Sequence, residues 1–174
     1  MLYQQSARYK VLQAFFREPN RRFQLRELSR ETKIALPSAI NHVKALAKDG
    51  FLEREKTGVY FAYLLKDTEK TRAYRRNDLL AGLDETGLVD EIDRKCRPNC
   101  IVLYGSAAQG ADDERGDIDI FVQAERHDIQ VEDYERTFNR TITLNFEPDF
   151  KRLTDEFVNG LANGITLRGY LKVR

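Results

Sequence analysis

Two aspartates and a glycine-serine pair in the second half of the chain have residue types suited to phosphate and metal chemistry. Asp117 and Asp119 begin an apolar run that ends at Val122, and Gly105-Ser106 follows a continuous apolar run, IVLY. Side chains alternate along a strand, so the two carboxylates are expected on the same face of a predicted strand. Two acids on a buried strand are unfavourable without a neutralising cation, and a divalent metal is the usual one.

The segment that holds both motifs, IVLYGSAAQGADDERGDIDIFV, resembles the signature of the nucleotidyltransferase superfamily with the DNA polymerase β-like fold, especially its minimal, small-protein branch. The resemblance implies that Gly105 and Ser106 hold a nucleoside triphosphate and that Asp117 and Asp119 bind Mg²⁺ as the catalytic pair. A helix N-terminus suits phosphate, and Mg²⁺ prefers one or two carboxylates plus substrate phosphates. The alternative is a hairpin or βαβ unit with a solvated acidic turn.

The strand predicted from Arg140 to Phe146 departs from this family. Active members carry a third carboxylate there, whereas the matching positions hold Thr143 and Asn145. Neither side chain accepts a proton or binds metal as a carboxylate does. Glu147 is expected on the same face of the strand as Thr143 and Asn145. It lies at the end of the strand, however, so it is only a secondary candidate for the third carboxylate. We therefore expect catalysis to be weak or absent.

The residues between the two motifs give two further expectations. Gly116 is a second departure, because the family commonly has Ser or Thr before the first aspartate. The acidic cluster that precedes it is expected to form a solvated loop tip rather than a metal site; its residues are Asp112, Asp113 and Glu114.

Charge is divided unevenly between the two halves of the chain. Residues 1–76 contain 17 Lys/Arg and 8 Asp/Glu, a net charge of +9, and residues 77–174 have a net charge of −8. Such a division indicates two domains with different partners, and it predicts that the partner of the basic first domain is a polyanion. The alternative is that the two halves attract each other within one body.

The order of predicted elements in the first half is typical of a winged helix-turn-helix. Apolar spacing predicts helices over residues 9–18, 25–32 and 37–48, the last with a stripe that includes Ile40 and Val43. Gly50 ends the third helix, and residues 51–55 and 59–65 form a hairpin. The stretch FQLRELSRETKIALPSAINHVKALAKDGFLEREKTGVYFAYLL resembles regulators of the broad ArsR/MarR type.

This resemblance implies that the third helix enters the major groove of double-stranded DNA. Polar groups near its start can reach base edges, and cations further along it and on the hairpin can contact phosphate. His42 has an alternative role, packed against the turn, and any single cation could simply be solvated. Arg21, Arg22 and Arg26 are additional phosphate candidates. The predicted DNA-binding residues are Ser38, Asn41, His42, Lys44, Lys48, Arg54 and Lys56.

Other features limit the class of protein. No apolar run approaches the length that spans a membrane, and no signal pattern is recognised, so we expect a soluble, cytoplasmic protein without a membrane partner. Cys96 and Cys100 are too few for a disulfide framework, and with His42 and His127 they do not make an obvious zinc site. Buried or idle thiols are the simpler interpretation.

The predicted fold class is α+β in two domains. We expect a winged helix-turn-helix over residues 1–66, a helical connector over 67–98, broken at Gly82 and Gly87, and a nucleotidyltransferase-like mixed sheet with flanking helices over 99–174. Within the last domain, helices are expected over residues 127–139 and 150–161, and a closing strand over residues 165–173. The connector helices would form a dimer interface or pack onto the second domain. A homodimer is expected because such regulators usually read two-fold sites.

The predicted function is a DNA-binding transcriptional regulator whose second domain binds Mg-nucleotide. The alternative is an active, antitoxin-like nucleotidyltransferase that moves NMP from NTP to a hydroxyl on a protein or nucleic acid. A third possibility is a dimerisation scaffold that binds neither nucleotide nor metal.

Overall fold

Helices and strands form two units, Met1–Arg72 and Ala73–Arg174, in a computed structural model that describes residues 6–113 and 115–172. Each unit combines helices with a small sheet, which confirms the predicted α+β class. The residues expected to form a connector divide between the units, because the boundary falls inside helix α4 (Glu69–Thr86). No helix in the described part of the chain is long and apolar enough to cross a membrane.

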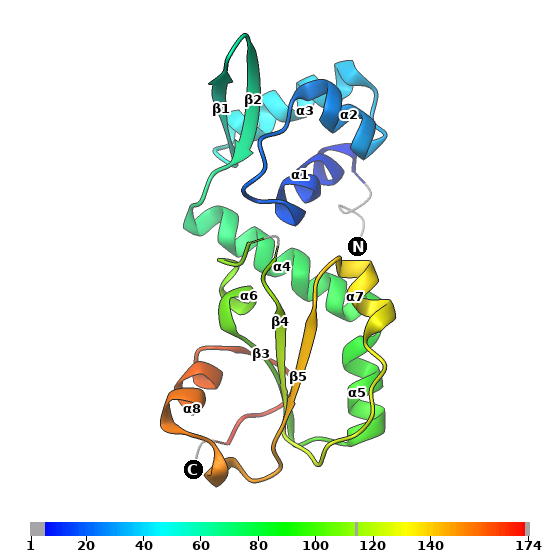
Figure 1. Ribbon diagram of the computed structural model, residues 1–174, viewed down its shortest axis with the longest axis vertical. Helices are drawn as coiled ribbons and strands as arrows, with labels where there is room; N and C mark the ends of the chain where they lie inside the picture. The colour runs from blue at the N-terminus through cyan, green and yellow to red at the C-terminus, as the bar shows by residue number, and fades with distance from the viewer. Residues whose placement is uncertain (1–5, 114, 173–174) are drawn as a thin grey trace. The chain divides into compact units, whose positions relative to one another are not determined.

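The first unit places three helices before a hairpin, in the predicted order (Figure 1). Ser6 caps the first helix by accepting a hydrogen bond from the backbone N–H of Tyr9, so this helix begins earlier than its apolar stripe predicts. Gly50, at φ +81°, follows the third helix, as the predicted left-handed cap requires. The elements are α1 (Ala7–Arg17), α2 (Leu25–Thr32), α3 (Leu36–Lys48), β1 (Leu52–Thr57) and β2 (Tyr60–Leu65).

The core of this unit lies between the helices and the base of the hairpin. Phe15 and Phe23 are fully buried and meet edge to face, with ring centroids 4.9 Å apart. The buried stripe of α3 is Ala39, Val43 and Leu46. The prediction that Ile40 belongs to this stripe is therefore wrong: Ala39 takes the inward position, and Ile40 stays only half-buried.

Helix α4 continues through Gly82, so the predicted break there is wrong. A Cβ on Gly82 would lie 2.9 Å from the ring of Phe138, so the glycine provides room for an aromatic side chain instead of ending the helix. The second predicted break is confirmed, because Gly87 at φ +77° separates α4 from α5 (Leu88–Cys96).

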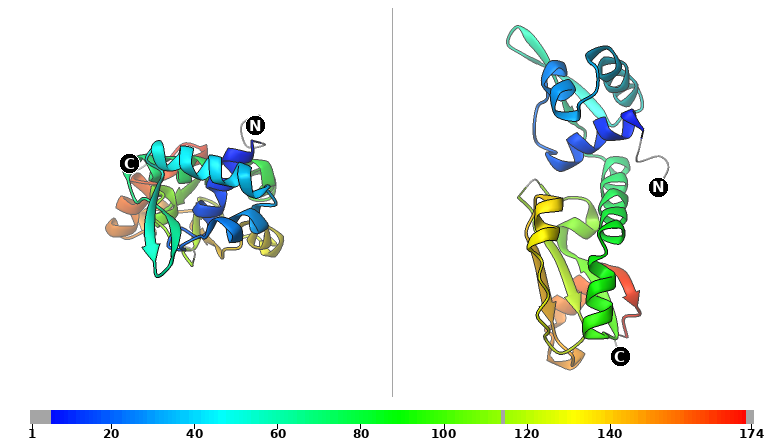
Figure 2. Two further views of the ribbon diagram at one scale, coloured as in Figure 1. Left: turned by 90° about the horizontal axis from the view of Figure 1, so that it is seen from above. Right: turned by 90° about the vertical axis from the view of Figure 1, so that its right-hand side faces the viewer.

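The second unit is built on a four-stranded mixed sheet in the order β5-β4-β3-β6 (Figures 1 and 2). Strand β3 pairs antiparallel with β4 and β6, whereas β4 and β5 are parallel. Parallel neighbours need a crossover connection, which here contains α7. The elements after α5 are β3 (Cys100–Tyr104), α6 (Gly105–Gln109), β4 (Ile118–Val122), α7 (Glu132–Phe138), β5 (Ile142–Phe146), a 3₁₀ turn (Phe150–Arg152), α8 (Asp155–Ala162) and β6 (Ile165–Gly169).

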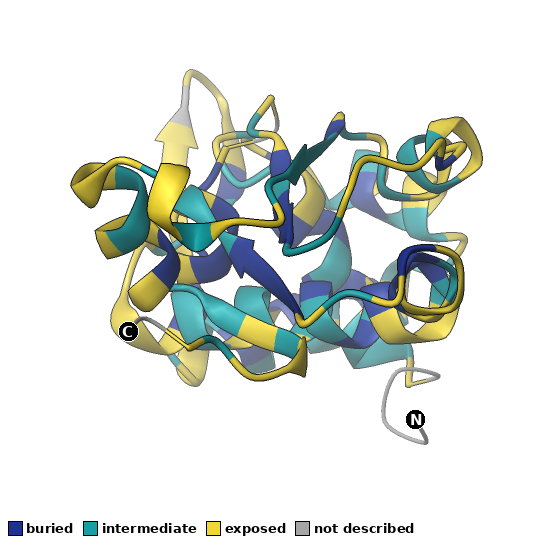
Figure 3. Cartoon of the chain, turned by 90° about the horizontal axis from the view of Figure 1, so that it is seen from below, coloured by how far each residue is buried: buried dark blue, intermediate teal, exposed yellow. Residues whose placement is uncertain are grey.

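The two faces of this sheet carry different side chains. One face packs against α4, α5 and α7 through a large apolar core that includes Leu83, Ile92 and Ile120. The other face meets α8 through a smaller cluster around Phe121 and Leu161. Figure 3 shows the buried residues concentrated in the central strands. Cys96 and Cys100 are free and buried, which confirms the prediction that these thiols are buried.

Three predicted boundaries in this half are wrong. The helix expected over residues 127–139 begins only at Glu132, because the residues before it form irregular chain. The helix expected over residues 150–161 divides at Thr154, whose hydroxyl caps α8. The last strand ends at Gly169 rather than at Val173, which lies outside the described residues.

Candidate functional site

The glycine-serine turn and the second aspartate lie against each other. Tyr104 pairs with Asp119 across β3 and β4, and Gly105 at φ +73° turns the chain directly into α6. A Cβ on Gly105 would lie 2.9 Å from Asp119 Oδ2, so only glycine allows the turn to approach the carboxylate this closely. Ser106 is exposed beside it in the first turn of α6.

Asp117 lies just before β4, exposed, while Asp119 is half-buried. Burial raises the pKa of Asp119, the nearby charge of Asp117 raises it further, and Arg140 opposes both. The two carboxylates therefore act on each other electrostatically, as their spacing predicts. Asp119 in turn adds to burial in raising the pKa of Tyr104, against the hydrogen bond from Asn145.

The strand register places no carboxylate at the third position of the site. Thr143 lies opposite Asp119 in the parallel pair, and Asn145 Nδ2 donates to Tyr104 Oη at 2.7 Å. Glu147 follows Phe146, which pairs with Val122, so it is four residues beyond Thr143, or about 13 Å along a strand. Its Oε1 accepts a hydrogen bond from the backbone N–H of Asp149. In this register Glu147 does not replace the missing acid.

The acidic loop before β4 is not a solvated tip, and that expectation is wrong for Asp112. The Asp112 side chain is buried and forms ion pairs with Arg75 at 3.2 Å and with Arg140 at 2.7 Å. A Cβ on Gly116 would lie 3.1 Å from the Asp112 Cβ, so a larger residue there would crowd the buried aspartate. Asp113 is exposed, and Glu114 lies outside the described residues.

Asp117 and Asp119 do not make up a complete metal site by themselves. Among the described residues no group of three or more His, Cys, Asp or Glu side chains is placed to hold an ion. Two hard carboxylate oxygens suit Mg²⁺ only where water and substrate phosphates complete its shell. Asp117 and Asp119 thus fit a metal that arrives with a nucleotide better than a resident one.

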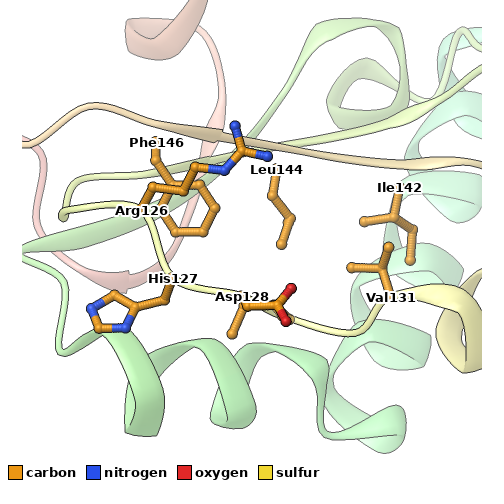
Figure 4. A pocket seen from close by; sticks show the side chains of 8 residues that line it. Arg126, His127, Asp128, Val131, Ile142, Leu144 and Phe146 are labelled. Carbon is orange, nitrogen blue, oxygen red and sulfur yellow. The ribbon is translucent and has the colours of Figure 1, made fainter.

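A separate pocket of about 300 Å³ lies beside β5 on the face that carries the larger core. Its lining includes Ile142 and Leu144 of β5 and residues 126–128 of the chain before α7, whose side chains Figure 4 shows. None of its lining residues belongs to the predicted nucleotide site. The alternation of side chains along β5 places the pocket on the face opposite Thr143 and Asn145.

In the first unit α3 presents a polar face opposite its buried stripe. Asn41, Lys44 and Lys48 are all exposed and recur at intervals of three and four residues, so they lie on one side of the helix. Ser38 and His42 are half-buried, and Ser38 Oγ hydrogen-bonds His42 Nε2 at 3.1 Å. Those two predicted DNA-binding residues therefore bond each other one turn apart on the same helix.

The hairpin separates charge between its faces. Register places Arg54 and Lys56 on the face that carries Phe61 and Tyr63, and the guanidinium of Arg54 lies 3.4 Å from the Phe61 ring centroid. The acids Glu53 and Glu55 alternate onto the opposite face. The structure thus adds Phe61, an exposed aromatic side chain, to the candidate binding residues predicted from the sequence. Counting residue pairs back from the turn of the hairpin would have placed Phe61 beside Lys56.

The three arginines near α2 are not equally available to phosphate. Arg21 lies 2.5 Å from carboxylate oxygens of both Glu18 and Glu27, and 3.2 Å from one of Glu31. Arg22 pairs with Glu55 at 2.5 Å. Arg26 is exposed on α2. Arg21 is therefore held within a carboxylate cluster and is a poor phosphate ligand, which corrects that expectation.

Comparisons with known proteins find structural similarity to three solved chains. No protein-family model matches the chain, and no curated protein matches it. Among solved structures, a protein described as a possible transcriptional regulator from Methanosarcina mazei Go1 is 20% identical, with 53% of this chain and 80% of that chain covered and a TM-score of 0.38. At this TM-score the description of that protein does not extend to this chain.

Proposed function

We propose that the chain is a DNA-binding transcriptional regulator that reads double-stranded DNA with α3 and the β1–β2 hairpin. The observation that carries this proposal is the division of α3 into a buried apolar stripe and an outward polar face at Asn41, Lys44 and Lys48. The net charge of +9 over residues 1–76 supports a polyanionic partner.

Each group has a distinct part in this binding mode. Asn41, one turn into α3, is placed to pair with an adenine edge in the major groove. Lys44 and Lys48 follow on the same stripe and contact phosphate, as do Arg54 and Lys56 on the cationic face of the hairpin. Ser38 restrains the His42 ring through its hydrogen bond.

Fluorescence anisotropy with duplex DNA at several salt concentrations tests the phosphate contacts. We expect Lys44→Ala and Lys48→Ala each to reduce the slope of log K against log salt by about 1. Lys151→Ala removes the same charge from an exposed position in the second unit and is the matched control. An equal change in slope for all three variants would refute a specific role for α3.

Selection from a random duplex library tests base reading. Asn41→Ala is expected to relax preference at one base position, worth about 1–3 kcal/mol of discrimination, without changing the salt slope. A uniform loss across all positions would instead assign Asn41 to the backbone.

A second candidate function is Mg-nucleotide binding in the second unit, with Asp117 and Asp119 holding the metal and Gly105 and Ser106 the triphosphate. It is favoured by the close approach of Gly105 to Asp119 Oδ2. Bound there, Mg²⁺ would offset the charge of the phosphates and of the two carboxylates. Because Thr143 lies where a base is needed, binding rather than transfer is the expected outcome.

Calorimetry with Mg²⁺ and each nucleoside triphosphate separates these functions. Binding that Asp117→Asn abolishes, with no label transferred to protein or nucleic acid, supports a nucleotide-sensing regulator. Transfer of label, also lost in Asp117→Asn, supports the alternative enzyme: an acceptor hydroxyl forms a bond to the α-phosphorus, pyrophosphate leaves, and the hydroxyl proton passes to solvent. Heat of binding that persists unchanged in Asp117→Asn excludes this site.

A further inference from the structure

A buried group of charged side chains in the second unit includes none of the residues proposed to bind DNA or nucleotide. Asp112 lies between Arg75 and Arg140, and the three side chains are only 7%, 9% and 14% exposed. Both carboxylate oxygens of Asp112 are engaged, Oδ1 by Arg75 at 3.2 Å and Oδ2 by Arg140 at 2.7 Å. Charges this well buried persist only when they are paired.

The two arginines also bind backbone carbonyls at both ends of one loop. Arg75 donates to the carbonyl oxygens of Gly110 at 2.9 Å and of Asp112 at 2.5 Å. Arg140 donates to those of Gly116 at 2.7 Å and of Asp117 at 3.0 Å. The chain from Gly110 to Asp117 is therefore fixed at one end to α4 and at the other to the residues that precede β5.

This loop is the connection between the glycine-serine turn and the aspartate pair. Its end determines where Asp117 lies relative to Asp119, two carboxylates whose like charges repel each other. A guanidinium can make several hydrogen bonds in a fixed planar arrangement, which a lysine ammonium cannot reproduce. Arg140 makes three such contacts, to Asp112, Gly116 and Asp117.

We propose that Arg140 is the positioning residue that holds Asp117 beside Asp119, and that buried Asp112 holds Arg140 in place for this purpose. The consequence for ligand binding rests on the proposed Mg-nucleotide function, whereas the constraint on the loop does not. Arg140 and Asp112 touch neither metal nor nucleotide in this scheme and act through the backbone of Asp117.

Amide hydrogen exchange tests the constraint without any ligand. The reporters are Gly116 N–H, bonded to the Asp113 carbonyl, and Ile118 N–H, bonded to the Thr141 carbonyl. In Arg140→Lys, which keeps the charge and loses the planar fork, exchange of both amides is expected to quicken by about tenfold or more. Arg136→Lys, an exposed position one turn earlier in the chain, is the matched control.

Two outcomes of this experiment overturn the proposal. One is equal exchange at Gly116 and Ile118 in Arg140→Lys and Arg136→Lys. The other is an increase spread evenly over β3 and β6, which would report general loosening of the unit instead of release of the loop. Asp112→Asn provides a second variant, expected to quicken the same two amides, with exposed Asp113→Asn as its control.

Calorimetry with Mg²⁺ and ATP then tests the consequence. Groups that orient metal ligands from behind typically contribute about 10- to 100-fold in affinity, and we expect a loss of that size in Arg140→Lys. Unchanged affinity in Arg140→Lys, with binding lost in Asp117→Asn, overturns the positioning role and leaves the nucleotide function standing. If the unmodified chain binds no nucleotide, the nucleotide function fails, and the exchange result still decides the constraint on the loop.

Discussion

The two units use charge in opposite ways. In the first unit the candidate binding face consists of exposed cations on α3 and the hairpin, and an ion pair such as Arg22 with Glu55 lies at the surface. In the second unit Asp117 is exposed, but two other acids are withdrawn from solvent: Asp119 is half-buried against a glycine turn, and Asp112 is buried between two arginines.

This difference indicates what each unit is built to do. Exposed charges are screened by salt and contribute little to folding, so they are free to meet a polyanion. Buried charges depend strongly on their partners, so they hold a fixed geometry. Polyanion binding by the first unit and a preorganised carboxylate site in the second follow as the corresponding expectations.

The largest expected effect is on the buried ion pairs. Asp112→Asn leaves Arg75 and Arg140 without their common carboxylate and should lower the free energy of unfolding of the second unit by about 3–5 kcal/mol. Denaturant unfolding measures it. Asp113→Asn, next to it in sequence but exposed, should change stability by less than about 0.5 kcal/mol. Similar values for both variants would remove the contrast between the units.

The next largest loss of stability is expected when alanine replaces a glycine with positive φ, at one such position in each unit. Gly50→Ala meets open space and should cost only the left-handed backbone penalty, about 1–2 kcal/mol. Gly105→Ala adds the displacement of Asp119 from its rotamer, for a total of about 2–3 kcal/mol. Chemical denaturation measures both losses. If the two alanine variants lost the same free energy of unfolding, Asp119 would not pack against the turn.

A smaller effect of opposite sign is expected at Asp119 itself. Burial and Asp117 raise the pKa of Asp119 in the folded state, so its contribution to stability is complete below the unfolded pKa and is lost as pH rises through the folded pKa. Asp119→Asn should therefore be more stable than the unmodified chain at pH 7, by about 0.5–2 kcal/mol.

Thermal unfolding between pH 3 and pH 8 measures this effect. The advantage of Asp119→Asn should shrink towards zero as pH falls below about 4, the ordinary pKa of an aspartate. An advantage that is constant with pH, or that grows in acid, would contradict the assigned direction of the pKa shift.

The smallest effect is expected at the surface pair of the first unit. Glu55→Gln removes the ion pair with Arg22, and water and salt replace most of that interaction, so no resolvable change in the unfolding midpoint is expected. The measurement is a thermal melt at low and at high salt. A loss comparable to that of Asp112→Asn would show that exposure does not distinguish the two classes of pair.

The local sequence pattern was sufficient to predict where most helices and strands of the first unit lie. The bounds of α2 are as predicted, Gly50 ends α3, and the predicted hairpin forms. Its turn is shorter than predicted, because β1 continues to Thr57 and only Gly58 and Val59 lie between the strands. Apolar spacing, capping and turn preferences act over a few neighbouring residues, so a single sequence contains them. The spacing of Asp117 and Asp119 likewise predicted two carboxylates that influence each other.

Only the tertiary structure determined how distant residues complete the second unit. Gly82 predicted a helix break, but in the structure Phe138 occupies the space beside this glycine and the helix continues. Asp112 predicted a solvated loop, but in the structure it is buried between Arg75 and Arg140. None of these three partners lies within a few residues of the position that it explains. The physical reason is that burial and pairing depend on the packing of separate elements, which no local pattern of residues records.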